Sequence, residues 1–66
     1  METRLLTLHQ VEDLTGFRRA FLYKEMAAGR FPRPVKIGPK AVRWEEMKVH
    51  RWIQDQIQES EQRGAQ

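Results

Sequence analysis

Cysteine is absent from this sequence of 66 residues. The chain therefore forms no disulfide and no thiolate metal site, which agrees with a reducing compartment. A chain of this length buries only about 60% of the surface that its unfolded form exposes, so we expect one domain with a small core. No apolar run approaches the ~18 residues of a membrane-spanning helix, and the N-terminus METRLLTLHQ lacks the pattern of a signal peptide. We expect a soluble protein inside the cell.

Side chains suited to catalysis are also scarce. The one serine, Ser60, lies near the C-terminus, and His9 and His50 stand alone in the sequence. Glu45 and Glu46 are adjacent, so they point apart and make a poor acid–base pair. No glycine-rich phosphate loop occurs. The sequence predicts no enzyme, no metal site, no cofactor and no small-molecule ligand.

Acidic residues are nearly missing from the middle of the chain. Residues 16–43 carry Glu25 alone against eight basic side chains, a formal charge of +7, whereas the segments 1–15 and 44–66 each carry −2. Such clustering indicates a polyanionic partner for one face, and the alternative is a solvated basic surface. The eight are Arg18, Arg19, Lys24, Arg30, Arg33, Lys36, Lys40 and Arg43.

Two helices are predicted in the first half of the chain, the second of them within the basic segment 16–43. Residues 8–15 have apolar side chains at helical spacing, preceded by a capping box from Thr7 to Gln10 and followed by Gly16 as a stop. A second helix runs from Arg18 or Arg19 to Ala28, with Gly29 ending it. The short, glycine-containing connection between the two is typical of a helix-turn-helix.

A β-hairpin is predicted next. The prolines of FPRP exclude helix, VKI and AVRW alternate as strands do, and GPK between them forms a turn. Val42 and Trp44 share one face of this hairpin, its outward residues include Lys36 and Arg43, and Lys40 lies at its tip. A lone hairpin is barely stable in water, so it must pack against the helices.

A third helix is expected from Glu45, with an apolar stripe at Val49, Trp52, Ile53 and Ile57. We predict a mainly α winged helix-turn-helix domain over residues 1–58 and a disordered tail over 59–66. Trp44 and Trp52 are expected to form most of the core, with Phe31 and Phe17 in core or turn packing.

The basic residues of the second helix and the hairpin are candidate DNA contacts. The N-terminal end of the second helix of a helix-turn-helix enters the major groove, which favours base contact by Arg18 and Arg19, with Tyr23 and Lys24 one turn later. Phe21 could touch a thymine methyl. The basic hairpin, with Lys36, Lys40 and Arg43, is expected to lie along the phosphate backbone or to insert its tip in the minor groove. Arg30 and Arg33, beside the end of the second helix, could also contact phosphate. The alternative is that lysines simply keep an exposed hairpin soluble.

The segments LLTLHQVEDLTG, LYKEMAAGRFPRPVKIG and AVRW, with VHRWI after them, resemble the AlpA-type regulators of phages and prophages, from about Arg4 to Ile57. That family is similar to excisionases and to MerR-type DNA-binding heads. The resemblance implies a small bacterial DNA-binding protein of the cytoplasm and nucleoid, and Arg19, Tyr23, Arg43 and Trp44 match family positions. Arg18 stands where the family usually has a helix-capping serine, and Ala20 and Phe21 replace hydroxyl residues.

Three functions follow as hypotheses. The first is a sequence-specific regulator that binds double-stranded DNA at promoters of a prophage or genomic island. The second is an excisionase that bends DNA at attachment sites and directs an integrase. The third is an adaptor whose basic face binds an acidic protein. A second copy on DNA is a further candidate partner, because one module of this size buries too little surface for tight specificity.

Overall fold

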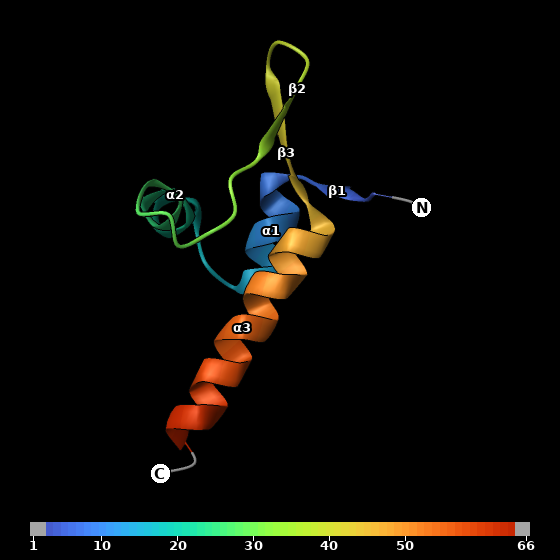
Figure 1. Ribbon diagram of the computed structural model, residues 1–66. Coiled ribbons are helices and arrows are strands. Elements are labelled where there is room, and N and C mark those ends of the chain that lie inside the picture. Colours follow the sequence, from blue (N-terminus) through green and yellow to red (C-terminus); the bar gives the residue numbers. More distant parts are fainter. Residues whose placement is uncertain (1–2, 65–66) are drawn as a thin grey trace.

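A computed structural model describes residues 3–64. Within these residues the chain forms three helices and three short strands. In Figure 1, α2 lies to the left of the α1–α3 pair, and a β-hairpin projects from the top of the molecule. The order along the chain is β1 (Leu5–Leu6), α1 (Leu8–Thr15), α2 (Arg19–Ala27), β2 (Val35–Ile37), β3 (Ala41–Glu45) and α3 (Glu46–Gly64). The predicted winged helix-turn-helix is confirmed, and the hairpin β2–β3 is its wing.

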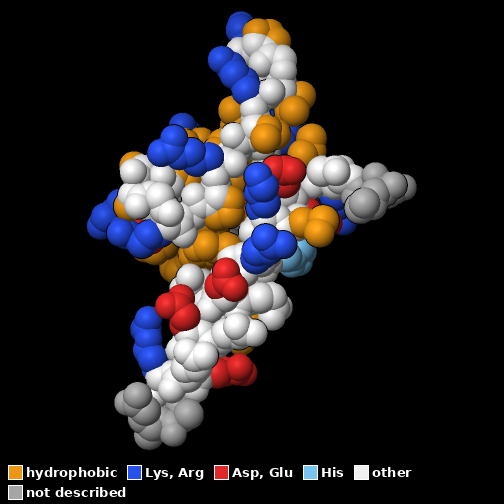
Figure 2. Space-filling model, in the orientation of Figure 1, with side chains coloured by type: hydrophobic (Ala, Val, Ile, Leu, Met, Phe, Trp, Pro, Cys, Tyr) orange, Lys and Arg blue, Asp and Glu red, His pale blue; other side chains and the backbone are white. Residues whose placement is uncertain are grey.

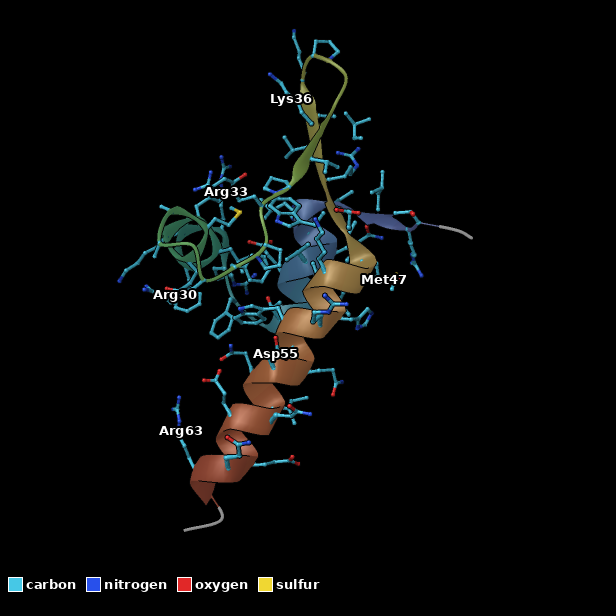
Figure 3. All side chains as sticks on the ribbon, in the orientation of Figure 1. Arg30, Arg33, Lys36, Met47, Asp55 and Arg63 are labelled. Carbon is cyan, nitrogen blue, oxygen red and sulfur yellow. The ribbon has the colours of Figure 1, made fainter. Side chains whose placement is uncertain are left out.

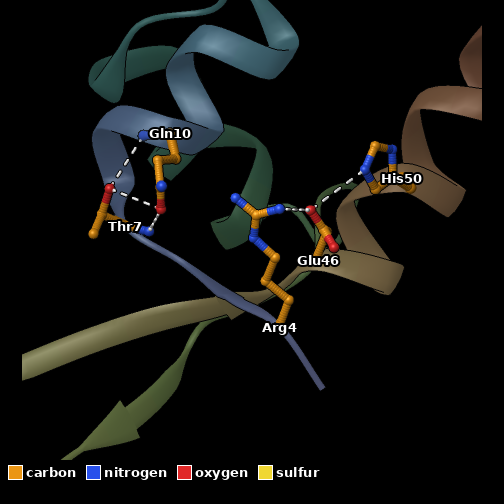
Figure 4. A network of polar contacts seen from close by, with 5 residues as sticks. All are labelled: Arg4, Thr7, Gln10, Glu46 and His50. Atoms are coloured by element: carbon orange, nitrogen blue, oxygen red, sulfur yellow. Dashed lines mark hydrogen bonds and ion pairs between the residues drawn. The ribbon is translucent and has the colours of Figure 1, made fainter. Parts of the chain in front are cut away.

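Local signals in the sequence define both ends of α1. The Thr7 Oγ1 atom accepts from the Gln10 amide at 3.2 Å, and the Thr7 amide donates to Gln10 Oε1 at 2.8 Å (Figure 4). Gly16 then ends the helix with a φ of 78°, a left-handed conformation that glycine adopts without strain. The predicted capping box, helix range and stop are confirmed.

The helix α2 begins without a side-chain cap. Arg18 occupies the N-cap position in extended conformation, and its side chain makes no capping hydrogen bond. Ala28 is the C-cap, and Gly29 follows with a φ of 77°. The predicted range is therefore confirmed to within one residue at each end.

The strand β1 was not predicted. It pairs antiparallel with β3, with Leu6 opposite Trp44, so that β3 is the central strand of a three-stranded sheet of order β1-β3-β2. The Glu46 amide donates to the Arg4 carbonyl at 2.9 Å, and the two side chains form an ion pair at 3.5 Å (Figure 4). The sheet thus fixes the N-terminal segment beside the start of α3.

The register of the wing corrects one prediction. Lys36 lies opposite Val42, and Val35 lies opposite Arg43. Directly opposed residues point to the same face of a sheet, and successive residues alternate between faces. Lys36 therefore shares a face with Val42 and Trp44, as predicted for the latter two, whereas Arg43 points to the other face. The expectation that Lys36 and Arg43 point outward together is wrong.

The core lies where the sheet meets the three helices. Trp44 is fully buried, and its indole Nε1 donates to the Pro32 carbonyl at 3.1 Å. Trp52 is only half-buried, with its ring 4.9 Å from that of Phe31, so the two tryptophans contribute unequally. The buried set also includes side chains from β1 and every helix: Leu6, Val11, Leu22, Met26, Phe31, Trp44 and Val49.

The helix α3 is longer than predicted. It starts at Glu46, because Glu45 is the last residue of β3, and it continues to Gly64, extending beyond the rest of the molecule (Figure 1). The prediction of a disordered tail from residue 59 is therefore wrong up to residue 64, and residues 65 and 66 lie outside the described part. Glutamine, glutamate and arginine favour helix, and the Glu59–Arg63 pair at 3.9 Å adds support at i,i+4 spacing. The domain limit at residue 58 stays a prediction.

Candidate nucleic-acid interface

The helix α2 turns a small and basic face to solvent. Leu22 and Met26 are buried, so the opposite side of the helix carries Lys24, with Ala20 four residues before it and Ala27 three residues after it. All three of these residues are exposed. The two alanines were not predicted as site residues, although their spacing from Lys24 places them on its face. Their small side chains leave the helix backbone accessible on both sides of the lysine.

Arg19 and Tyr23 form a connected pair on the flank of α2. The Arg19 guanidinium carbon lies 5.4 Å from the centre of the Tyr23 ring. The Tyr23 ring in turn stands nearly perpendicular to that of Trp44, with 6.5 Å between centroids and an angle of 84°. Because Trp44 belongs to β3, this flank of α2 is the one that faces the base of the wing.

Basic side chains also occupy the angle between α2 and the wing. In Figure 3, Lys36 extends to the side of the wing on which Arg33 and α2 lie. The shallow hollow between α2 and the start of the wing is lined by Tyr23, Met26, Ala27, Arg33 and Pro34. Lys40 lies in the turn of residues 38–40 at the tip, as predicted, and Gly38 enters that turn with a φ of 70°.

Arg30 differs from the other mid-chain cations because it is paired with the one acid of this region. Its guanidinium donates to both carboxylate oxygens of Glu25, at 2.9 and 3.0 Å. This hydrogen bond holds the pKa of Glu25 below its usual value and raises the pKa of Arg30. The Arg30 carbonyl also accepts from Trp52 Nε1 at 2.6 Å. Arg30 therefore links the end of α2 to α3, and its charge is largely offset.

The remaining mid-chain cations have no acidic partner. Within residues 3–64, the ion pairs of Lys and Arg join Arg4, Arg30, Lys48 and Arg63 to glutamates. Figure 2 shows basic side chains around α2 and along the wing, whereas the acidic side chains on this face lie along α3, apart from one near the base of the wing. Seven cations of residues 16–43 are thus available to an external anion: Arg18, Arg19, Lys24, Arg33, Lys36, Lys40 and Arg43.

A comparison with known protein families identifies the family of this chain. Residues 4–57 match the family described as Prophage CP4-57 regulatory protein (AlpA). The chain belongs to the AlpA family. This match confirms the resemblance inferred from the sequence. No curated protein and no solved structure matches the chain.

AlpA is a family of regulatory DNA-binding proteins, and the matched range spans β1, α1, α2, the wing and α3 as far as residue 57. Both basic elements of this AlpA chain therefore lie inside the family region. The part of α3 beyond residue 57 lies outside it.

Two residues of this AlpA chain that were predicted to contact DNA, Phe21 and Arg43, lie away from the surface formed by Arg19, Tyr23 and Lys24. Phe21 stacks on Phe17, with 4.2 Å between ring centroids, and the Phe17 ring lies 6.2 Å from that of Trp52. Phe21 therefore faces α3, on the flank opposite Tyr23. Arg43 points to the other face of the wing, where its guanidinium donates to the Val42 carbonyl at 2.8 Å.

Two other kinds of feature are absent from residues 3–64 of this AlpA chain, a metal-binding cluster and a membrane-spanning helix. No group of three His, Asp or Glu side chains in that range is placed to hold a metal ion. None of its helices combines the length and apolar character needed to cross a membrane.

Proposed function

We propose that this chain is a sequence-specific double-stranded DNA-binding regulator of transcription in a prophage or genomic island. In this proposal α2 reads base edges in the major groove and the wing holds the phosphate backbone. The observation that carries the proposal is the set of seven unpaired cations on α2, the wing and the segment between them. Membership of the AlpA family supports the same partner.

Base reading is assigned to the N-terminal half of α2. Arg19 has a free guanidinium whose fork can pair with the O6 and N7 atoms of one guanine. Ala20 and Lys24 lie on the exposed side of the helix, where the alanine permits close approach and the lysine reaches a phosphate. Arg18 stands at the N-cap position, where it can reach a phosphate at the groove edge.

Backbone contact is assigned to the side of the wing that faces α2. Lys36 and Arg33 lie in the angle between the two elements (Figure 3), and Lys40 extends the row to the tip. Cations that neutralise phosphates release counterions, which supplies affinity without sequence preference. Arg30, Phe21 and Arg43 are secondary in this arrangement, because Arg30 is paired, Phe21 faces α3 and Arg43 points to the opposite face.

The salt dependence of duplex binding tests the electrostatic part of the proposal. Each neutralised phosphate contributes a slope of about −0.9 to a plot of log affinity against log salt concentration, so four or five contacts give a slope of roughly −4. Fluorescence anisotropy with a labelled duplex measures this slope. A flat response would contradict the proposal and favour a protein partner for the basic face.

Selection of bound fragments from genomic DNA supplies the cognate site, and Arg19→Ala then tests base reading. We expect this variant to lose about 1–3 kcal/mol on the selected site and to discriminate less at one base pair. Lys40→Ala is the matched control, because removal of a phosphate contact should weaken all sequences alike. A change of base preference in Lys40→Ala would contradict the division of roles. A promoter fusion measured beside an excision assay distinguishes promoter control from a role in excision.

A further inference from the structure

Tyr23 lies between the base-reading arginine of the proposed function and the buried centre of the molecule. The Arg19 guanidinium lies over the Tyr23 ring at 5.4 Å, and the Tyr23 ring rests edge to face against Trp44 at 6.5 Å. Trp44 is fully buried and held by its hydrogen bond to the Pro32 carbonyl. A continuous stack therefore runs from the core to the guanidinium.

The Arg19 side chain has no hydrogen-bonding or ion-pair partner within the described residues. Within residues 3–64, the interaction recorded for its guanidinium is the cation–π contact with the Tyr23 ring. A cation–π contact uses none of the guanidinium N–H donors for a conventional hydrogen bond. Base pairing by arginine uses these in-plane donors. The stack thus restrains the side chain without consuming the groups that read a base.

The tyrosine hydroxyl plays no part in this restraint. None of the hydrogen bonds within residues 3–64 uses it, and the side chain is 40% exposed. The ring alone makes both contacts, to Arg19 and to Trp44. A phenylalanine would keep both contacts, whereas an aliphatic side chain would lose them.

We infer that Tyr23 is a specificity-determining positioning residue: it holds Arg19 in the orientation that reads a base and does not itself recognise DNA through its hydroxyl. This inference rests on the proposed function, because it assigns how the base-reading arginine of that function is oriented. A flexible arginine must lose side-chain freedom when it binds, and a restrained one has lost part of it beforehand. Because Tyr23 also packs against Trp44 of β3, the position of Arg19 depends on the base of the wing. The two elements proposed to contact DNA are therefore oriented by the same ring.

The test is a double-mutant cycle of Arg19→Ala and Tyr23→Leu, with Tyr23→Phe as the matched variant. Affinity is measured for the selected site and for the same duplex changed at the base pair that Arg19 reads. We expect Tyr23→Leu to reduce discrimination between the two by about three- to tenfold, the scale of a cation–π contact, with no change of the salt slope. In the Arg19→Ala background Tyr23→Leu should have no further effect on discrimination, because nothing remains to be positioned. Tyr23→Phe should keep the wild-type ratio.

A second measurement covers the case in which Tyr23→Leu disturbs packing on Trp44. In NMR spectra of the free protein, the side-chain protons of Arg19 should be shifted upfield by the tyrosine ring, and Tyr23→Phe should preserve that shift. Loss of discrimination in Tyr23→Phe, additive effects in the cycle, or unshifted Arg19 protons would each overturn the inference. These outcomes differ from failure of the proposed function, in which the wild-type protein selects no sequence at all.

Discussion

At the scale of single residues, the two helices of the helix-turn-helix differ in how they begin. Thr7 caps α1 with its hydroxyl, whereas Arg18 occupies the same position of α2 with no hydrogen-bonding side chain. An uncapped helix start leaves amide groups to water. A capping side chain at position 18 should therefore stabilise the protein, whose core is small.

We predict that Arg18→Ser raises the free energy of unfolding by about 1 kcal/mol, because a serine hydroxyl in this extended conformation can accept from an amide of the first turn. Urea denaturation followed by circular dichroism measures the change. Thr7→Ala is the complementary control and should lower stability by a similar amount. An Arg18→Ser protein no more stable than wild type would show that water already satisfies the first turn of α2. Since Arg18 is also a proposed phosphate contact, the same variant should bind DNA more weakly.

The Glu25–Arg30 pair predicts a pH dependence of stability. The Arg30 hydrogen bond lowers the pKa of the Glu25 carboxyl below its usual value of 4.5, so the ionised form is favoured in the folded protein. The stabilisation is therefore complete above the unfolded pKa and is lost as the pH falls through the lowered folded pKa. We expect the stability difference between wild type and Glu25→Gln to be largest near neutral pH and to shrink in acid. Denaturation curves over a pH series measure it, and a difference that grows in acid would contradict the assignment.

At the scale of elements, the wing has two chemically different faces. Lys36 lies with Val42 and Trp44 on the face toward α2, and Arg43 lies on the other. We predict that Lys36→Ala weakens duplex binding on all sequences and makes the salt slope shallower by about 0.9, whereas Arg43→Ala changes both much less. Anisotropy titrations at several salt concentrations compare the two variants. Equal losses would show that DNA contacts both faces of the wing.

Elements with local signals could be predicted from the sequence. The range of α1 follows from the Thr7–Gln10 capping box and Gly16, and the wing strands follow from their alternation on either side of GPK. Two features depend on the partner strand instead. The strand β1 is two residues long, too short to show a period, and forms through its non-local pairing with β3. The shared face of Lys36 and Val42 is set by the register across the turn, which alternation within one strand does not determine.

The candidate site likewise has features that the sequence predicts and features that depend on non-local contacts. The sequence placed the cations on α2 and the wing, because charge can be counted without a structure. It did not predict that Arg30 pairs with Glu25, since that contact requires the chain to turn back at Gly29. It also left the side of Phe21 open, and this depends on where α3 packs. The contact that offsets the charge of Arg30 and the contacts that turn Phe21 toward α3 both come from tertiary packing.

At the scale of the whole molecule, Trp44 is the residue on which the elements converge. Its strand pairs with β1 through Leu6, its indole donates to the Pro32 carbonyl, and its ring meets Tyr23 of α2. Trp52 also joins segments, through its hydrogen bond to the Arg30 carbonyl, but it is partly exposed to solvent. Truncation of each tryptophan therefore compares the stability lost at a fully buried and at a partly exposed side chain of the same type.

We predict that Trp44→Ala leaves the chain largely unfolded at room temperature, whereas Trp52→Ala remains folded with reduced stability. Truncation of a fully buried aromatic side chain costs about 3–5 kcal/mol, and a domain of this size has a total stability of roughly 3–10 kcal/mol. Trp52 loses less because part of its ring is already in water. Circular dichroism and thermal melting measure both variants. If Trp44→Ala melted cooperatively at a temperature close to that of Trp52→Ala, the wing and α2 would be held in place by contacts other than Trp44. The orientation of the two DNA-binding elements would then not depend on this one ring.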